Sequence, residues 1–263
     1  MSAVAATARA RAAGSAPALA VHGAGKRFGA VTALDGVDFD VHRGEVVALV
    51  GDNGAGKSTL IKCLNGVHRL DSGTIRMEGA PVTIHAPADA RALGIETVYQ
   101  DLSLFDNLRP TDNFYAGREL AGPAWLPRSL RLLKRRRMTE ATRQVLERLQ
   151  VTLPDFSALV GLMSGGQRQA VAVIRAAAFA STVVILDEPT AALGVRESRK
   201  VLDLILRLRD ENKAVVVVSH AMDHVMEVAD RAVVLRRGQK VGELIPTSET
   251  YQEIVSLIVG GAD

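Results

Sequence analysis

Short, mostly apolar segments recur along the 263-residue chain with the length and composition of buried strands. They are residues 46–50 (VVALV), 95–99 (IETVY), 183–187 (VVILD) and 214–219 (AVVVVS). Near-continuous apolar runs of this length are typical of strands that are covered on both faces. Helical patterns separate them, as in residues 201–208 (VLDLILRL), where apolar positions fall at i, i+3, i+4 and i+7. The alternation predicts an α/β fold with a mainly parallel sheet.

The two flanks of this pattern predict further strands. Residues 19–79 are rich in short strand-like segments: apolar and polar positions alternate in residues 37–41 (VDFDV), and a turn is expected at Gly44. Residues 232–245 (AVVLRRGQKVGELI) predict a hairpin. The chain then closes on an amphipathic helix, whose apolar residues Tyr251, Ile254, Val255 and Ile258 have helical spacing.

Between Asp101 and Leu162 the strand signal disappears. Apolar residues recur there at four-residue spacing, as in Ala141, Val145 and Leu149, and prolines mark the expected ends of helices. We therefore expect a helical subdomain at about residues 101–162, inserted into the α/β core. Residues 1–17 are alanine-rich with scattered arginines and lack a continuous apolar region, which predicts a disordered leader before a single domain over residues 18–263.

Composition narrows the class of protein. A hydrophobic content of 48% supports one large core, or one core with a smaller lobe, and no apolar run approaches the roughly 20 residues that cross a bilayer. We expect a cytoplasmic protein. The single cysteine, Cys63, excludes an internal disulfide and is expected to be a small buried residue. The net charge of +3 suits a nucleic-acid or lipid-surface partner but is equally common in ordinary enzymes.

Residues 51–59 (GDNGAGKST) match the phosphate-loop pattern G-x-x-x-x-G-K-[ST] and follow a predicted buried strand directly. Glycines let backbone N–H groups turn toward phosphates, the Lys57 ammonium reaches the β and γ oxygens, and the Ser58 hydroxyl is available to Mg²⁺. A glycine turn can also be only a tight connection, but glycine, lysine and serine at this spacing favour binding of ATP or GTP. The expected nucleotide contacts are Gly51, Asn53, Gly54, Ala55, Gly56, Lys57, Ser58 and Thr59.

Two carboxylates end the predicted strand at residues 183–187. Such a strand usually ends beside the phosphate loop, at the carboxyl edge of the sheet. Asp187 would hold Mg²⁺, directly or through water, and Glu188 would polarise an attacking water. The alternative is a solvated turn; beside a phosphate loop the pair favours hydrolysis.

A second glycine loop, residues 161–171 (GLMSGGQRQAV), has no lysine that could face a phosphate. Ser164, the backbone of Gly165 and Gly166, and the start of a predicted helix could still bind an anion. These groups suffice for a γ-phosphate that is already bound elsewhere.

Taken in order, GDNGAGKST, YQ, MSGGQ, VVILDEPTAAL and VVSH resemble the nucleotide-binding subunits of ATP-binding cassette (ABC) transporters, over about residues 19–237. The chain is most similar to the subunits of bacterial importers for simple sugars of the ribose, xylose and fructose kind. The resemblance implies a phosphate-loop ATPase core with an N-terminal antiparallel β subdomain and an inserted helical subdomain. It also implies ATP and Mg²⁺ as ligands.

The resemblance implies roles for further residues. Gln100 would contact the metal and the attacking water, His220 would contact the γ-phosphate, and the Phe28 ring would stack on adenine. Alternatively, Gln100 is a polar residue at a strand end, His220 a histidine at a helix start, and Phe28 a core ring. In the family the second loop completes the ATP site of the opposite subunit, which here involves Ser164, Gly165, Gly166 and Gln167.

The implied partners are a second copy of the chain, membrane permease subunits and, indirectly, a periplasmic or lipid-anchored sugar-binding protein, with the chain peripheral on the cytoplasmic face of the membrane. Residues 102–119 would form the groove for a permease helix. No nucleic acid is expected, although a soluble ABC ATPase acting on nucleic acid, or a cassette for another substrate, is the alternative. The basic residues 128–138 (RSLRLLKRRRM) could contact the permease or acidic headgroups, or be a solvated face. One departure is Gly194, where most such cassettes carry an aspartate.

Overall fold

A computed structural model describes residues 14–123, 125, 127, 132–151, 157–191 and 193–260. Most of the leader predicted at residues 1–17 therefore lies outside the described residues. The centre of the molecule is a six-stranded sheet in the order β12-β11-β3-β10-β9-β6, in which only β12 pairs antiparallel. Its strands are β3 (Val46–Val50), β6 (Ile95–Val98), β9 (Val183–Asp187), β10 (Ala214–Val218), β11 (Arg231–Arg236) and β12 (Gln239–Leu244). The prediction of a mainly parallel sheet is confirmed.

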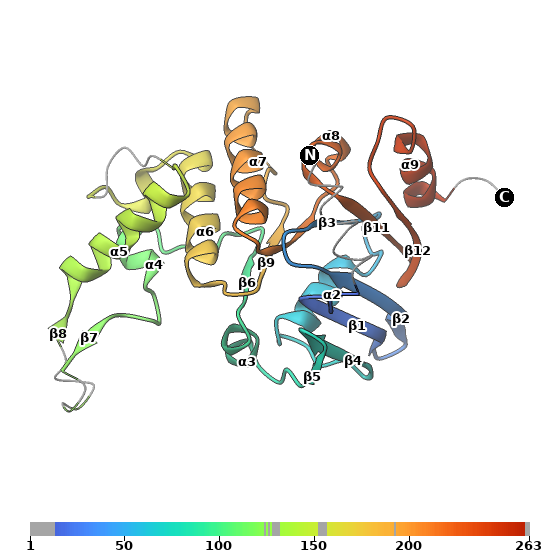
Figure 1. Cartoon of the computed structure of the whole chain (residues 1–263), viewed down its shortest axis with the longest axis horizontal. Coiled ribbons are helices and arrows are strands. Elements are labelled where there is room, and N and C mark those ends of the chain that lie inside the picture. The colour runs from blue at the N-terminus through green and yellow to red at the C-terminus, as the bar shows by residue number, and fades with distance from the viewer. Residues whose placement is uncertain are drawn as a thin grey trace.

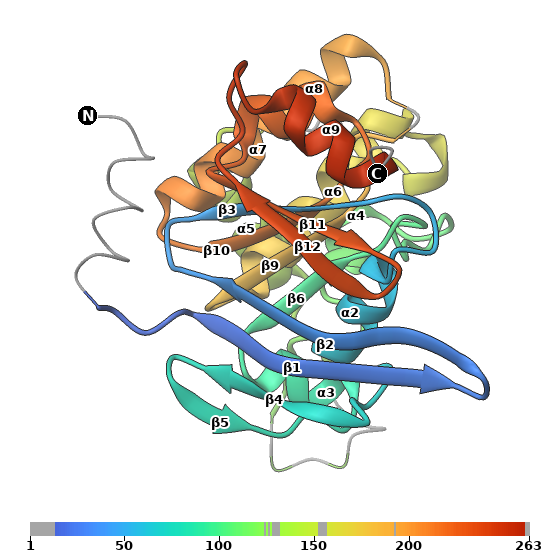
Figure 2. The same ribbon diagram turned by 90° about the vertical axis from the view of Figure 1, so that its right-hand side faces the viewer.

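A second, antiparallel sheet lies below the first, as Figure 2 shows. Its order is β2-β1-β4-β5, with bounds β1 (Leu19–Phe28), β2 (Val31–Val41), β4 (Ser72–Met77) and β5 (Ala80–Val82). One continuous apolar core joins the two sheets, because Phe39 of β2 packs in the same cluster as Leu49 of β3. Between these strands the chain turns at Gly44, as predicted, with a φ of 69° that favours glycine.

Helices cover both faces of the central sheet (Figure 1). Helix α2 (Lys57–Leu64) lies between the two sheets and α3 (Pro87–Ala92) packs beside β6, whereas α6 to α9 cover the opposite face. The alternation of side chains along β3 explains this layering: Val47 and Leu49 face the first core, and Ala48 and Val50 face α8 and α9. The bounds are α6 (Gly165–Phe179), α7 (Val195–Asp210), α8 (Met222–Val228) and α9 (Tyr251–Val259).

The region expected to be helical holds α4 (Pro110–Phe114), α5 (Arg135–Arg148) and the short 3-10 turn η2 (Val160–Leu162). The sequence pattern gave no strand signal there, yet β7 (Ala121–Gly122) and β8 (Leu132–Leu133) pair antiparallel. Two-residue strands are too short to produce a periodic pattern. Among the described residues, no helix is long and apolar enough to cross a membrane.

The closing elements agree with the sequence pattern. Strands β11 and β12 form the predicted hairpin, and α9 places Ile254 in a buried cluster with β3 and β11. Just past the end of α2, Gly66 has a φ of 79°, the left-handed conformation in which helices commonly end. Cys63 is buried, and burial raises the pKa of its thiol to about 11.

Candidate functional site

The phosphate loop, residues 51–59, leaves the carboxyl end of β3 and enters α2. Its glycines are required sterically, because a Cβ on Gly51 would lie 2.2 Å from the Leu235 carbonyl oxygen, and one on Gly56 would lie 2.7 Å from that of Ala33. Gly56 is the N-cap of α2 with a φ of 106° and has no side chain to occupy the first N–H groups of the helix. Those amides, together with the positive end of the helix dipole, suit a phosphate.

The Lys57 ammonium lies across this loop. Its Nζ donates to the carbonyl oxygens of Gly51 at 2.7 Å and Asp52 at 3.0 Å. Partial burial lowers the pKa of Lys57, and the nearby carboxylates Glu188, Asp52 and Asp187 oppose that shift. The ammonium can exchange these carbonyl oxygens for phosphate oxygens, so the residues present fit a nucleoside triphosphate.

Asp187 reaches the same edge of the sheet through strand order. Strand β10 pairs with both β9 and β3 in parallel, so the carboxyl ends of all three strands meet. Burial raises the pKa of Asp187, the neighbouring Glu188 raises it further, and Lys57 lowers it. The described residues contain no cluster of three or more His, Cys, Asp or Glu that could hold a metal alone. Mg²⁺ typically uses one or two carboxylates plus substrate phosphates. Asp187 offers one carboxylate, and the loop would hold the phosphates of the substrate.

Glu188 and His220 form a direct pair. The Nδ1 of His220 lies 2.7 Å from Oε1 of Glu188, and the backbone N–H of Glu188 donates to the Val218 carbonyl at 2.9 Å. Glu188 has a φ of 51°, which is uncommon for a residue with a side chain and is held here by the sheet edge. The Glu188 side chain is 13% exposed and that of His220 is 75% exposed. A carboxylate oriented by an imidazole in this way can accept a proton from water.

Gln100 lies just past β6 and is exposed. The loop after it is strained, since Leu102 and Ser103 have φ values of 60° and 45°. Arg175 of α6 stabilises that loop: its Nη1 donates to the Ser103 carbonyl at 2.9 Å and its Nη2 to the Leu102 carbonyl at 3.2 Å. No sequence pattern indicated Arg175, because its partners lie more than 70 positions earlier in the chain.

Phe28 ends β1 and is 43% exposed, so the alternative that it is a core ring is wrong. Its ring meets His68 edge-on, with centroids 5.1 Å apart, and the Lys26 ammonium lies 5.5 Å from the Phe28 centroid. An exposed face with a cation nearby leaves the ring available to stack on a flat ligand.

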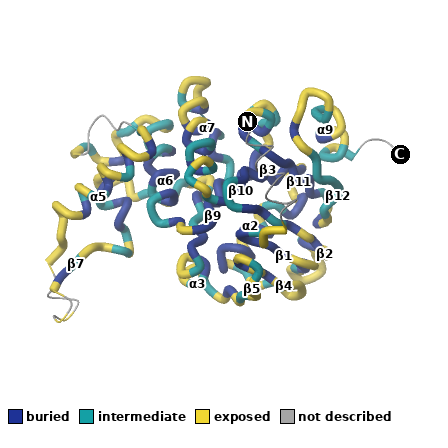
Figure 3. The backbone as a smooth tube through the Cα atoms, viewed as in Figure 1, coloured by how far each residue is buried: buried dark blue, intermediate teal, exposed yellow. Residues whose placement is uncertain are grey.

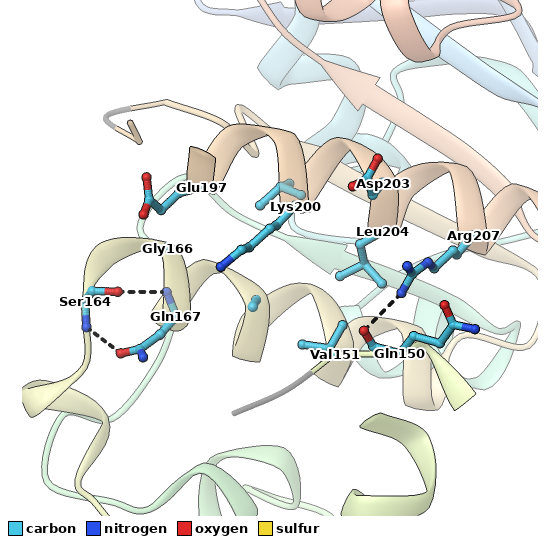
Figure 4. A pocket seen from close by; sticks show the side chains of 12 residues that line it. Gln150, Val151, Ser164, Gly166, Gln167, Glu197, Lys200, Asp203, Leu204 and Arg207 are labelled. Atoms are coloured by element: carbon cyan, nitrogen blue, oxygen red, sulfur yellow. Dashed lines mark hydrogen bonds between the residues drawn. The ribbon is translucent and has the colours of Figure 1, made fainter. Parts of the chain in front are cut away.

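The second glycine loop is built differently. Ser164 caps α6: its Oγ accepts from the Gln167 N–H at 3.3 Å, while the Ser164 N–H donates to Oε1 of Gln167 at 2.9 Å (Figure 4). Gly166 allows α6 to approach α7, because a Cβ there would lie 2.5 Å from Cγ of Glu197. By contrast, the nearest contact for a Cβ on Gly165 is 3.7 Å away, at Leu193.

The two glycine loops open on different cavities. The cavity beside Ser164, of about 410 Å³, lies between α6 and α7 and has no residue of the phosphate loop in its lining (Figure 4). The cavity beside Asn53 and Gly54, of about 390 Å³, is lined from the other side by Arg236 and Arg237. The described structure therefore does not bring the predicted contacts of the second loop to the phosphate loop of the same chain.

The segment between β9 and α7 adds two features that were not predicted. Thr190 Oγ1 lies 2.9 Å from Nδ1 of His224, which links the stretch after Glu188 to α8. Gly194 is the N-cap of α7, and a Cβ there would lie 2.8 Å from a carboxylate oxygen of Glu197. That oxygen is the far end of a flexible side chain, so the contact does not by itself exclude a larger residue at position 194.

Comparison with known proteins agrees with this geometry. The sequence profile of the family described as "ABC transporter" matches residues 34–191, more than half of the chain. The fructose import ATP-binding protein FrcA of Rhizobium meliloti is 47% identical, over 94% of this chain and 95% of that protein. The xylose/arabinose import ATP-binding protein XylG of Sulfolobus acidocaldarius is 44% identical, over 90% and 92%. With the ribose import ATP-binding protein RbsA 1 of Rubrobacter xylanophilus, identity is 42% over 93% of this chain but 47% of that protein.

Solved structures share the fold. A nucleotide-free ATP-binding cassette from an ABC transporter has a TM-score of 0.78 at 26% identity, covering 92% of this chain and 97% of that one. The ADP conformation of the cassette MJ1267 has a TM-score of 0.76 at 25% identity, covering 93% and 99%. The chain belongs to the ABC transporter family. Within it, this is an ATP-binding subunit that hydrolyses ATP, with Mg²⁺ as cofactor.

Proposed function

We propose that the chain energises the uptake of a simple sugar, as the ATP-hydrolysing subunit of an importer that works with a membrane permease. The relatives named for fructose and for xylose or arabinose import support this, because each match covers more than nine tenths of the relative. The observation that best supports hydrolysis is the 2.7 Å contact between Glu188 and His220, beside Lys57 and Asp187.

Nucleotide binding follows from residues 51–59. The Lys57 ammonium releases its two carbonyl partners and pairs with the β and γ oxygens of ATP, while loop amides and the first N–H groups of α2 donate to the phosphates. The exposed face of Phe28 stacks on adenine. Mg²⁺ supplies positive charge to the phosphate oxygens; its protein contacts are assigned to Ser58, Gln100 and Asp187.

Hydrolysis then uses the carboxylate of Glu188. It accepts a proton as the water oxygen bonds to the γ-phosphorus and the bond to the bridging β–γ oxygen breaks, giving ADP and phosphate. His220 holds the carboxylate through Nδ1 and contacts the γ-phosphate through its other nitrogen. Arg175 fixes the loop behind Gln100, so that the glutamine can align the same water.

The second glycine loop acts on the ATP of a second copy of the chain. Ser164, Gly165, Gly166 and Gln167 are exposed or half-buried at the start of α6, and the positive end of that helix favours an anion. In a two-fold pair each site would use Lys57 from one chain and Ser164 from the other. Closure of the pair on two ATP molecules and its opening after hydrolysis would drive the permease.

The remaining assignments concern partners and boundaries. Residues 18–263 form the ATP-binding domain, and residues 101–162 form a helical subdomain whose loop at 102–119 receives a cytoplasmic helix of the permease. A periplasmic or lipid-anchored sugar-binding protein delivers the substrate. The chain itself is peripheral on the cytoplasmic face of the membrane, and nucleic acid is not among the partners.

The test is reconstitution of the chain with a permease and a sugar-binding protein, which we expect to be encoded by neighbouring genes. We expect the chain to co-purify with the permease and to drive ATP-dependent accumulation of one labelled pentose or hexose in vesicles. Glu188→Gln in the same assembly should abolish accumulation. Tight, salt-sensitive binding of nucleic acid without permease binding would contradict the proposal, and so would accumulation of a substrate that is not a sugar.

A further inference from the structure

Strand β8 and the start of α5 lie at the far end of the helical region (Figure 1), where Figure 3 colours the chain mostly as exposed. Apolar and basic side chains are exposed together there. Trp125 and Leu132 are each 81% exposed, and Leu133 is also exposed. Four consecutive cations follow directly in the chain, and all four are exposed. We name this surface the tip patch; it consists of Trp125, Leu132, Leu133, Lys134, Arg135, Arg136 and Arg137.

The fold holds the basic part of the tip patch in place. Met138, the next residue, is 1% exposed and packs with α4 and α6 in the second core cluster, as does Leu146 further along α5. The Lys134 N–H donates to the Leu120 carbonyl at 2.7 Å. Its side chain lies over Gly122, where a Cβ would come within 2.6 Å of the lysine Cε. The charges are therefore carried on a packed helix.

The charges of the tip patch are not balanced within the described part of the chain. None of the four cations forms an ion pair with a described carboxylate, and α5 has no acidic residue in its first turn. Three arginines at the start of a helix also face the positive end of its dipole, which is unfavourable. The arrangement thus concentrates positive potential instead of cancelling it, at a cost that an external anionic surface would offset.

The apolar members argue against a simply solvated face. A solvated run of charges needs neither a tryptophan nor leucines beside it. The interface of a bilayer favours apolar and basic residues together. Tryptophan partitions to the headgroup level, leucines enter the acyl boundary, and lysine and arginine are attracted to anionic lipids. Strand β8, which carries Leu132 and Leu133, lies beyond the start of α5 (Figure 1), so these leucines would enter first, with the cations at headgroup depth.

We propose that the tip patch binds the surface of a lipid bilayer that contains anionic headgroups. The contact gives the chain an affinity for the membrane that does not require the permease, and it orients the helical region toward the bilayer. It rests on the proposed function only in that the chain works at a membrane.

The test is partition of the purified full chain onto vesicles, measured by co-sedimentation without ATP, sugar or permease. Vesicles of phosphatidylglycerol mixed with phosphatidylcholine should bind the chain, and phosphatidylcholine alone should bind it far less. Binding should weaken as salt rises. The triple variant Arg135→Gln, Arg136→Gln, Arg137→Gln should lower the partition coefficient on the order of 100-fold, since each cation near an anionic surface contributes a factor of roughly five.

Two further variants separate the tip patch from general charge. Trp125→Ser keeps the charge and should lower partition roughly tenfold at any salt concentration, because the buried ring area is lost. The matched control Arg69→Gln, Arg76→Gln, Arg91→Gln removes three exposed arginines from the opposite lobe and should bind like the unmodified chain. The ATP affinity of every variant is measured as a check of folding, because the tip patch contains none of the proposed ATP contacts.

Three results would overturn the proposal. The chain could bind both kinds of vesicle equally, or the control triple variant could lose as much vesicle binding as the tip-patch variant. The third result is that tip-patch substitutions lower binding only when permease is present. The last result would assign the surface to an acidic segment of the permease. Because the vesicle measurement uses no ATP hydrolysis and no transport, a chain that fails to import sugar can still pass it, and the two proposals fail separately.

Discussion

The two glycine loops of this chain have similar compositions and opposite surroundings. Residues 51–59 enclose a lysine ammonium, and the carboxylates of Asp187 and Glu188 act on its pKa. At the second loop the Ser164 hydroxyl is engaged in capping α6, and Gly166 serves the contact between α6 and α7. No residue of the phosphate loop lines the cavity beside Ser164. Glycine content alone therefore does not tell these two kinds of loop apart. The charged groups around each loop do.

The difference assigns separate consequences to damage at each loop. The phosphate loop with its carboxylates should carry binding and chemistry within one chain. The second loop should contribute no nucleotide binding or chemistry in a single chain, and should become essential to hydrolysis only when two chains meet. Matched variants at the two loops should therefore differ in nucleotide binding, turnover and stability.

Glu188→Gln should reduce ATP turnover at least about 100-fold, because general-base catalysis contributes 10²–10⁴-fold in rate. ATP should still bind, since the Lys57 contacts are untouched, and the ATP-bound pair should accumulate in size-exclusion chromatography. The matched control is Glu197→Gln, a carboxylate beside the second loop, which should keep most of the turnover. Equal losses in the two variants would show that Glu188 has no special place at the site.

Lys57→Ala should weaken ATP binding by roughly 10–100-fold, because a charge-assisted contact with the phosphates is lost. Lys62→Ala changes an exposed lysine on the same helix and is expected to bind ATP normally. A nucleotide titration by calorimetry measures both. Unchanged affinity in Lys57→Ala would mean that the ammonium keeps its carbonyl partners when nucleotide binds.

Gly166→Ala should lower the free energy of unfolding by about 1–3 kcal/mol, since its new methyl group would overlap Glu197 and push α6 from α7. Gly165→Ala is the matched control: its methyl would meet Leu193 at an ordinary 3.7 Å, so stability should change little. Thermal or denaturant unfolding followed by circular dichroism compares the two. Equal stability would contradict the packing role given to Gly166.

Local patterns predicted most of the fold and the phosphate loop. Strands β3, β9 and β10 are short apolar runs, and residues 51–59 contain the loop, the lysine and the helix start in consecutive positions. Their structure depends on neighbours in sequence, which a pattern can capture. Asp187 and Glu188 were predictable for a related reason, because parallel strands end at one edge of the sheet.

Contacts between distant residues were not predictable in this way. Arg175 meets the carbonyl of Ser103 across 72 positions, and Thr190 meets His224 across 34. Neither pair belongs to a periodic pattern, so only the folded chain reveals them. Gly166 illustrates a second limit: the sequence indicated a glycine available to a phosphate, whereas its close approach to Glu197 depends on how α6 and α7 pack.

The central claim, that each ATP site combines the phosphate loop of one chain with the second glycine loop of another, is tested most directly by mixing two inactive variants. Lys57→Ala and Ser164→Arg should each hydrolyse ATP very slowly alone, the latter with ATP binding intact. In an equal mixture at saturating ATP, half of the pairs are mixed, and each mixed pair has one intact site. Turnover should recover to about a quarter of the unmodified level.

The control mixes Ser164→Arg with the double variant Lys57→Ala, Ser164→Arg, which cannot form an intact site in any pair. The account predicts recovery in the first mixture and none in the control. Turnover in the first mixture that stays at the level of the control would contradict the shared site.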